Sequence, residues 1–328
     1  MLGLIIVTLL GGLLVLALLS PLESLRWWSR DGHEVSTLLS GMTSQDLIAA
    51  GQRAGHAAAD GPQQYVVYLS GVGAIGGSAE SNSKTERHFL NALESRLDRA
   101  SVTGDVFPYS VQNLGLPQRR GGGIWERASR GSGRKKGISL LPWIINLRNV
   151  FQVLVAADPR YGPTYGLGLA QVIWKSARAR GYVLGSGATI TILGYSGGAQ
   201  MALNAAWFLE GVGIPMQIVS MGGVFENHSS FERIRRFIHL YGEKDSLMFI
   251  GRTFSPGRWK RSVNSEYNQA KSEGRVVEMC IGPMSHDAKK WYLDHKTFAA
   301  DGRSYFDITV DAVVEFLQET PPPTAIPS

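Results

Sequence analysis

From Gln64 onward, short apolar runs alternate with longer amphipathic segments, and this alternation limits the possible folds more than any other feature. The runs have the length of buried strands, and the segments between them repeat apolar residues at helical spacing. We expect strands at residues 65–69, 105–111, 189–193, 216–221, 237–241 and 275–281, and helices at residues 84–100, 165–180, 199–210 and 305–319. A content of 44% hydrophobic and 18% charged residues supports a large core and excludes a mainly disordered chain. The pattern predicts an α/β fold with a mostly parallel, doubly wound sheet covered by helices on both faces.

The first 20 residues form an apolar run, and the first charged side chain is that of Glu23. About 20 apolar residues in a helix are long enough to cross a hydrocarbon core of about 30 Å. No basic residue precedes the run, and Pro21 and Leu22 make a poor cleavage context, which favours an uncleaved anchor over a signal peptide. We therefore expect a single transmembrane helix at residues 1–22 and a membrane-proximal linker at residues 23–63.

The C-terminal flank of the apolar run carries residues typical of a membrane interface. Trp27 and Trp28 fit an interfacial aromatic belt, and Arg26 and Arg30 lie beside them. Because basic residues favour the cytoplasmic side, the domain at residues 64–320 is expected to be cytoplasmic. The Pro-rich residues 321–328 are expected to be a disordered tail.

Residues 112–162 interrupt the alternation and have a length that suits a lid, a binding loop or a disordered segment. The first part holds one acid, Glu126, and seven basic residues, namely Arg119, Arg120, Arg127, Arg130, Arg134, Lys135 and Lys136. The second part is apolar and would present an amphipathic lid face made of Trp143, Ile144, Ile145, Leu147, Val150 and Phe151. Beside an anchor, and in a chain of net charge +6, this insertion favours contact with the anionic headgroups of a lipid bilayer. A solvated basic loop and an apolar segment that caps the core are the alternatives.

The five residues from Gly194 to Gly198 read GYSGG, a G-x-S-x-G motif, and lie between a predicted strand and a predicted helix. A sharp strand-to-helix turn needs small residues beside the serine, and it lifts the hydroxyl clear of the sheet. The helix N-terminus then directs N–H groups toward the site and favours developing negative charge. This context predicts that Ser196 is a nucleophile, with a serine in a tight turn as the alternative.

A serine nucleophile needs a base, and the base needs an acid that orients it. When a nucleophile occupies such a turn, the expected chain order is serine, then acid, then histidine, each after a strand. Asp245 follows the predicted strand at residues 237–241, and His286 follows the last predicted strand. Glu226, after the strand at residues 216–221, is a second candidate for the acid.

The Gly-rich loop after the first strand would supply part of an oxyanion hole. One donor is expected from the N–H of Gly197, after the nucleophile, and the other from the N–H of Val72. The same loop contains glycines at positions 71, 73 and 76, which formally match a dinucleotide-binding fingerprint. A polar, turn-like stretch follows instead of a helix, and no acid ends the next strand, so nucleotide binding is the weaker interpretation.

Other classes of site have little support in the sequence. The single cysteine, Cys280, excludes an intramolecular disulfide framework and a cysteine-based zinc finger. No H-E-x-x-H motif occurs, and the basic residues form no known nucleic-acid module. We predict no cofactor, no metal and no nucleic-acid partner.

With the serine motif, the ordered acid and histidine and the early Gly-rich loop, residues 65–319 resemble the α/β-hydrolase superfamily. The resemblance implies an eight-strand type of sheet, a triad of Ser196, His286 and Asp245, and cleavage of an acyl ester through an acyl-serine. The loop reads SGVG where common lipase patterns begin with His-Gly. An acyltransferase or a thioesterase with the same triad is an alternative function. A non-catalytic membrane scaffold is another, and a structure with Asp245 and His286 out of reach of Ser196 would favour it.

Overall fold

The computed structural model describes residues 61–74, 82–110, 113, 140–286 and 289–319, together with Thr8, Gly11, Gly12 and Val15. Its centre is a six-stranded sheet in which every neighbouring pair is parallel, in the order β2-β1-β3-β4-β5-β6. The strands are β1 (Gln64–Leu69), β2 (Ala100–Thr103), β3 (Thr189–Tyr195), β4 (Met216–Met221), β5 (Arg236–Tyr241) and β6 (Val276–Cys280). The predicted α/β fold with a parallel sheet is therefore confirmed. The described residues form six strands, where the resemblance implies an eight-strand type of sheet.

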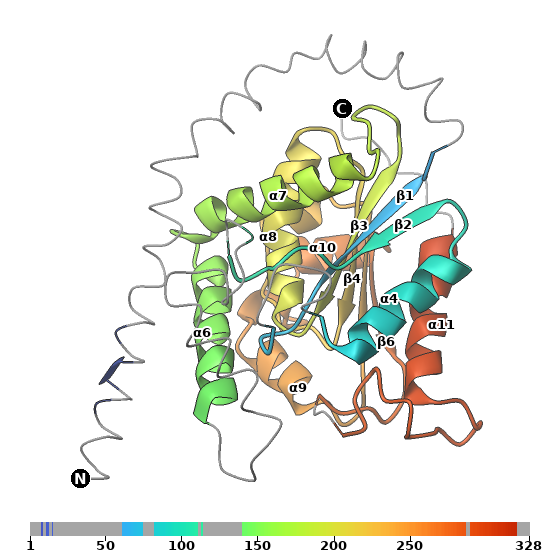
Figure 1. Cartoon of the computed structure of the whole chain (residues 1–328). Coiled ribbons are helices and arrows are strands. Elements are labelled where there is room, and N and C mark those ends of the chain that lie inside the picture. Colours follow the sequence, from blue (N-terminus) through green and yellow to red (C-terminus); the bar gives the residue numbers. More distant parts are fainter. Residues whose placement is uncertain are drawn as a thin grey trace.

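Helices cover both faces of the sheet (Figure 1). They are α4 (Lys84–Arg96), α6 (Leu140–Ala157), α7 (Gly162–Ala179), α8 (Gly198–Gly211), α9 (Ser246–Thr253), α10 (Glu266–Ser272) and α11 (Tyr305–Gln318), with short 3₁₀ helices at Ser229–Glu232 and Pro256–Arg258. Helices α7, α8 and α10 pack on one face, and α4 and α11 pack on the other. Parallel strands buried on both faces explain why the strand sequences are nearly continuous apolar runs.

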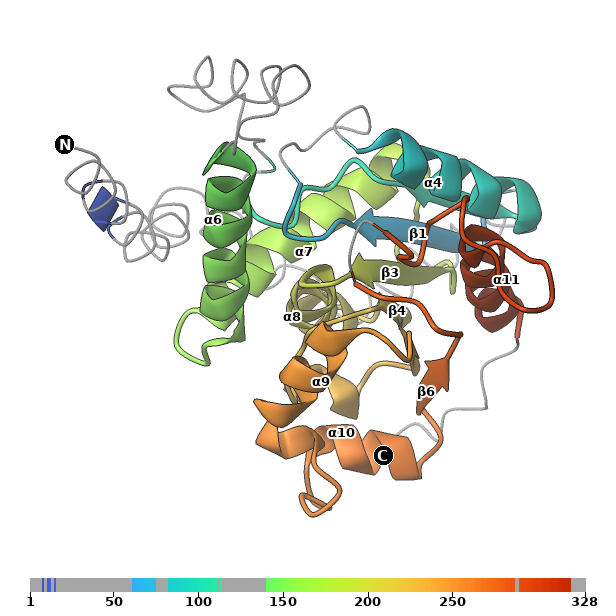
Figure 2. The same cartoon turned by 90° about the horizontal axis from the view of Figure 1, so that it is seen from below.

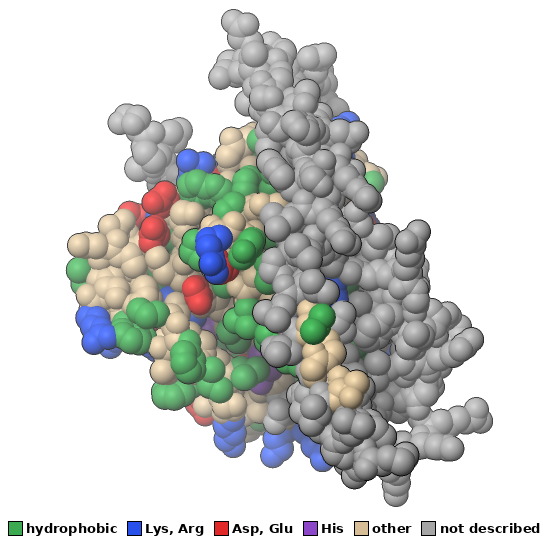
Figure 3. Space-filling view, turned by 90° about the vertical axis from the view of Figure 1, so that its left-hand side faces the viewer, with side chains coloured by type: hydrophobic (Ala, Val, Ile, Leu, Met, Phe, Trp, Pro, Cys, Tyr) green, Lys and Arg blue, Asp and Glu red, His purple; other side chains and the backbone are tan. Residues whose placement is uncertain are grey.

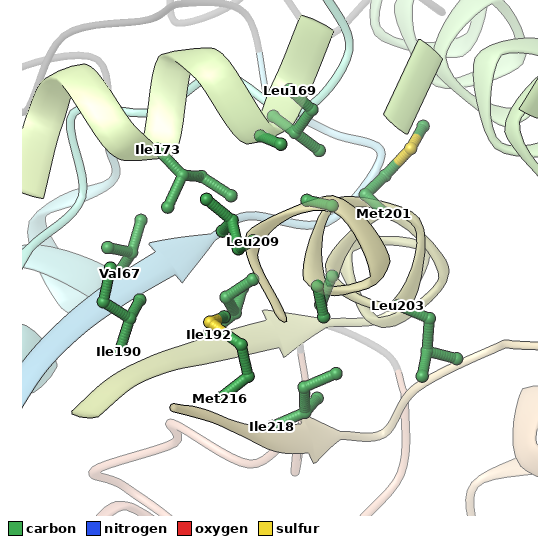
Figure 4. Packing of buried hydrophobic residues seen from close by; sticks show 14 of the residues in the cluster. Val67, Leu169, Ile173, Ile190, Ile192, Met201, Leu203, Leu209, Met216 and Ile218 are labelled. Atoms are coloured by element: carbon green, nitrogen blue, oxygen red, sulfur yellow. The ribbon is translucent and has the colours of Figure 1, made fainter. Parts of the chain in front are cut away.

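The two faces of β1 show how the core is divided. Val67 and Leu69 point to the α7–α8 side, whereas Val66 and Tyr68 point to the α4–α11 side. Successive side chains of a strand alternate between faces, so one apolar run contributes to both clusters. Figure 4 shows the first cluster, where Val67, Ile190 and Ile192 of the sheet face residues of α7 and α8.

The chain between α4 and α6 departs from the predicted elements. The predicted helix at residues 84–100 ends four residues early, because Leu97 is extended and Arg99 takes a positive φ of 51° before β2 begins. The strand predicted at residues 105–111 is wrong, since β2 ends at Thr103. The side chain of Asn113 accepts from Phe107 N–H and donates to the Asp105 carbonyl, so these backbone groups bond to a side chain instead of a neighbouring strand.

The described part of the insertion is mainly α6, which packs against α7 and α8. Ile145 and Asn149 are buried on its inner side, and Val150 is exposed. Asn204 of α8 donates to the Ala156 carbonyl near the end of α6 and ties the two helices together. Val153 and Ala156, which are not part of the predicted lid face, pack this helix against the core. The seven basic residues lie outside the described residues.

Several predictions concern chain that the structure does not describe. The linker and the tail lie outside the described ranges apart from residues 61–63, and only Thr8, Gly11, Gly12 and Val15 of the predicted anchor are described, all in helical conformation. Within the described residues, no helix combines the length and the apolar character needed to span a membrane.

Candidate active site

Ser196 occupies the turn between β3 and α8 in a backbone conformation that is rare for a residue with a side chain. Its φ is +55°, and such a left-handed conformation costs about 1–3 kcal/mol unless the surroundings enforce it. The N–H of Ser196 donates to the Met221 carbonyl at 3.1 Å, and the Ser196 carbonyl accepts from Val224 N–H at 3.1 Å. These bonds to the segment at the end of β4 hold the strained residue in place.

Two glycines of the motif are required by close backbone contacts. A Cβ on Gly194 would lie 2.6 Å from the nitrogen of Ala199, and a Cβ on Gly198 would lie 2.5 Å from the Leu69 carbonyl oxygen. The first contact is within the turn, and the second is between α8 and the end of β1. The motif thus packs the turn against the neighbouring strand, at the carboxyl end of β3 where α8 begins (Figure 2).

His286, in the loop after β6, lies between the serine and the aspartate. Its Nε2 is 2.8 Å from Ser196 Oγ, and its Nδ1 is 2.9 Å from Asp245 Oδ2. If Nδ1 carries the ring proton and donates a hydrogen bond to the carboxylate, Nε2 accepts a hydrogen bond from the serine hydroxyl. The ring of Tyr195 stacks on the imidazole at 5.3 Å and 12°, and its hydroxyl donates to the His286 carbonyl at 3.2 Å.

Asp245 comes shortly after β5 and is the N-cap of α9. Its Oδ1 accepts from the N–H groups of Leu247 at 3.0 Å and Met248 at 3.2 Å, which fixes the carboxylate relative to the helix. Burial pushes the pKa of Asp245 upward, but hydrogen bonds from His286 and Tyr292 outweigh it and hold the pKa below its ordinary value. The carboxylate is therefore kept ionised in a buried position.

Tyr292 is part of the site that sequence reasoning missed. Its hydroxyl donates to Asp245 Oδ2 at 2.6 Å and accepts from Gly242 N–H at 2.9 Å. The ring is fully buried, and the adjacent charge and burial raise the pKa of its hydroxyl. No local motif marks this tyrosine, because its partner is 47 residues away in the chain and the two side chains meet only in the folded structure.

The loop after β1 lies against the nucleophile, as predicted for an oxyanion site. A Cβ on Gly71 would lie 3.4 Å from Ser196 Cβ, and a Cβ on Gly197 would lie 3.2 Å from Val72 Cγ1. Within the described part of the chain, neither the Val72 N–H nor the Gly197 N–H has a hydrogen-bond acceptor. Both donors are accordingly available to an oxygen bound beside Ser196.

The competing residues are not assembled around Ser196. Glu226 is exposed, and the acid that contacts His286 is Asp245. Gly76, the third glycine of the formal dinucleotide fingerprint, lies outside the described residues, and the next helix begins at Lys84. Among the described residues, no group of three or more histidine, cysteine, aspartate or glutamate side chains is placed to hold a metal ion.

A second serine–histidine pair lies inside the sheet. Ser220 Oγ is 3.0 Å from His239 Nδ1, and both side chains are fully buried. Burial lowers the pKa of His239 to about 3, with a further contribution from the charge of Arg258. The pair of Ser220 and His239 therefore stays neutral and is shielded from substrate. It offers an internal comparison for the pair of Ser196 and His286.

Comparison with known proteins adds no relative to this description. No protein-family model matches the chain, and no curated protein is found to be similar to it.

Proposed function

We propose that the chain is a membrane-anchored serine hydrolase of the α/β-hydrolase type that cleaves an acyl ester through an acyl-serine. The observation that carries the proposal is the continuous chain of contacts from Ser196 Oγ through both ring nitrogens of His286 to Asp245. Its two distances, 2.8 and 2.9 Å, are within the range expected for an activated nucleophile and its base. The left-handed φ of Ser196 in a strand-to-helix turn supports the same proposal.

The reaction follows from these positions. His286 Nε2 takes the proton of Ser196 Oγ while Oγ forms a bond to the carbonyl carbon of the ester. The N–H groups of Val72 and Gly197 hold the resulting oxyanion, and His286 returns its proton to the alcohol as the ester bond breaks. A water molecule then gives a proton to His286 and attacks the acyl-serine. His286 returns that proton to Ser196 Oγ as the acyl bond breaks, which releases the acid and the free serine.

The carboxylate of Asp245 has a separate task in this sequence. It accepts the Nδ1 proton, keeps the ring oriented toward Ser196 and stabilises the imidazolium that forms during each transfer. A depressed pKa keeps Asp245 charged for this purpose. The hydroxyl of Tyr292 donates to the same carboxylate oxygen as His286 and supports the same charge.

The surroundings favour a substrate with an apolar acyl group. Helix α9 begins next to Asp245 and exposes Phe249 at 70% and Ile250 at 46%, and the residue that caps its C-terminus, Phe254, is 76% exposed. Figure 3, which shows the left-hand side of Figure 1, displays several groups of hydrophobic side chains on this face. Large exposed apolar patches mark binding surfaces for protein, ligand or membrane. Together with the N-terminal apolar run and the basic insertion, these exposed apolar side chains support a lipid-like ester at a bilayer as the substrate. In this proposal the domain lies on the cytoplasmic side of the membrane.

Two alternatives, an acyltransferase and a thioesterase, differ from the proposed hydrolase in the acceptor or leaving group that reaches His286. An acyltransferase or thioesterase would use the same three residues, and adding a primary alcohol to the assay separates transfer to alcohol from transfer to water. A non-catalytic scaffold would leave Ser196 without its base, and the close contact between Ser196 and His286 argues against it.

The test is fluorophosphonate labelling of the full-length protein in detergent, with mass spectrometry to locate the adduct. We expect an adduct on Ser196 that is lost in Ser196→Ala and His286→Ala. Ser220→Ala is the matched control, because it removes a serine that is also paired with a histidine but is fully buried. Labelling that survives in Ser196→Ala, or a folded wild-type protein that is not labelled, would contradict the proposal.

A further inference from the structure

We propose that Asn149 of α6 is a positioning residue that holds the oxyanion loop in its active geometry, so that the inserted segment completes the site. The inference rests on the proposed function. Asn149 lies in the insertion, far in sequence from both the loop and the serine motif, and its side chain is fully buried. Its Nδ2 donates to the Val72 carbonyl at 2.7 Å and to the Ala74 carbonyl at 2.8 Å.

The orientation of the Asn149 amide is determined by its neighbour. Arg148 Nη1 donates to Asn149 Oδ1 at 2.8 Å, and Arg148 Nη2 donates to the Tyr109 carbonyl at 3.2 Å. A guanidinium is a donor only, so the oxygen of the amide must face Arg148 and the NH₂ group must face the loop. Asn149 can therefore serve the loop only as a donor.

The loop itself is a tight turn whose central peptide needs such a donor. Ala74 N–H donates to the Gly71 carbonyl at 3.0 Å, which closes a four-residue turn with Val72 and Gly73 in the middle. The central peptide of a turn can adopt two opposite orientations, as in the type I and type II forms. Asn149 binds the carbonyl of that central peptide and so selects one orientation.

Other bonds hold the two preceding carbonyls of the loop, whereas α6 holds the Val72 and Ala74 carbonyls through Asn149. The Ser70 carbonyl accepts from the Tyr109 hydroxyl at 2.9 Å, and the Gly71 carbonyl accepts within the turn. Because a trans peptide is planar, anchoring the Gly71 carbonyl also directs the Val72 N–H to the opposite side. A flip of the Val72–Gly73 peptide would change the ψ angle of Val72, next to that N–H, and would break the bond from Asn149 to the Val72 carbonyl.

The same part of α6 lies against the loop and the serine turn at two further points. A Cβ on Gly73 would lie 3.6 Å from Asn146 Oδ1, and a Cβ on Gly197 would lie 2.7 Å from Val153 Cγ2. Helix α6 therefore lies beside the oxyanion loop and beside Gly197, whose N–H is the second proposed donor. These contacts link the position of α6 to the geometry of the proposed oxyanion site.

The test compares Asn149→Asp with the wild-type full-length protein, using p-nitrophenyl butyrate as the substrate. Aspartate keeps the shape and the acceptor for Arg148 but has no donor for the loop. We expect kcat to fall about 10- to 100-fold, a loss no larger than that caused by removing one oxyanion donor. KM should change by less than about threefold. The affinity for an alkyl trifluoromethyl ketone, which forms an oxyanion on the serine, should fall in parallel with kcat/KM.

The matched control is Gln152→Ala, which removes a buried amide one turn further along the same side of α6 and has no bond to the loop. We expect it to lower the melting temperature while kcat stays close to wild type. Asn149→Gln, which retains the donor, should recover part of the lost kcat. If aspartate prevents folding, Asn149→Ala takes its place.

This design distinguishes a failure of the role of Asn149 from a failure of the proposed function. An unchanged kcat and ketone affinity in a folded Asn149→Asp protein, while the wild type is labelled on Ser196, would overturn the role of Asn149 alone. Absence of Ser196 labelling in the wild type would instead overturn the proposed function.

Discussion

At the scale of single residues, the buried charge of Asp245 is the most demanding feature of the site. A buried carboxylate is costly unless it is paired and hydrogen-bonded. Here Oδ1 accepts from two backbone N–H groups of α9, and Oδ2 accepts from His286 and Tyr292. Of these donors, Tyr292 is the one whose hydroxyl can be removed without changing either the helix cap or the catalytic base.

We predict that Tyr292→Phe lowers the free energy of unfolding by about 2 kcal/mol at neutral pH, because a hydrogen bond to a charged group contributes about 1.5–3 kcal/mol. The pKa of Asp245 is depressed in the wild type, so its stabilisation is present above the ordinary value of 3.8 and is lost as the pH falls through the lower, folded value. In the variant that pKa moves back toward 3.8. The two stability curves should therefore converge in acid.

Urea unfolding of both proteins between pH 7 and pH 3 measures this effect. Tyr182→Phe is the control, since the Tyr182 hydroxyl donates to the Ala188 carbonyl at 3.2 Å and contacts no carboxylate. That variant should lose about 1 kcal/mol at every pH. A Tyr292→Phe curve that runs parallel to the wild type down to pH 3 would show that the hydroxyl does not stabilise the charge of Asp245.

At the scale of secondary-structure elements, the site depends on how closely α8 approaches β1. The N-terminus of α8 lies so near the end of β1 that position 198 has no room for a Cβ. That approach brings the loop after β1 next to Ser196, so that the two proposed oxyanion donors, the N–H groups of Val72 and Gly197, lie near each other beside the serine. The turn therefore constrains both the backbone conformation of Ser196 and the distance between α8 and β1.

We predict that Gly198→Ala destabilises the protein by about 1–3 kcal/mol, because an added methyl group would force α8 away from the Leu69 carbonyl. Serine labelling should fall as well, since the loop and the turn move apart. Gly211→Ala is the matched control at the other end of the same helix, where the nearest atom to a Cβ is Arg233 Nη1 at 3.7 Å. It should be neutral or stabilising by up to about 1 kcal/mol. Equal thermal midpoints for the two variants would contradict the close-approach argument.

At the scale of the whole molecule, the proposed function requires the apolar N-terminal run to anchor the folded domain in a membrane. We predict that Leu10→Lys with Leu14→Lys releases the protein from membranes, since each charge near the centre of a spanning helix costs about 2.5–3.5 kcal/mol. Alkaline carbonate extraction measures the released fraction. The control pair, Leu38→Lys with Leu39→Lys in the linker, should stay in the membrane pellet. A wild-type protein that carbonate extracts completely would contradict the predicted anchor.

The sequence by itself determined the type and order of most elements, because buried parallel strands and amphipathic helices have patterns that are local in the chain. Strand β4 was predicted with the bounds that the structure shows, and β5 was predicted to within one residue. Local chemistry also singled out Ser196, Asp245 and His286, since each follows a strand whose carboxyl end faces the same edge of the sheet. The strand predicted at residues 105–111 failed because the side chain of Asn113, six to eight residues further along the chain, bonds the backbone of Phe107 and Asp105 in place of a neighbouring strand.

Only the tertiary structure decided which polar groups meet across the fold. The hydroxyl of Tyr292 reaches Asp245 from a loop 47 residues away, and Asn149 reaches Val72 from a helix 77 residues away. Neither residue carries a local signal, because a hydrogen-bond partner is chosen by where the backbone places it and not by neighbouring residues in the chain. The physical reason is that hydrophobic periodicity specifies which face of an element is buried, whereas the packing of elements specifies which buried groups touch.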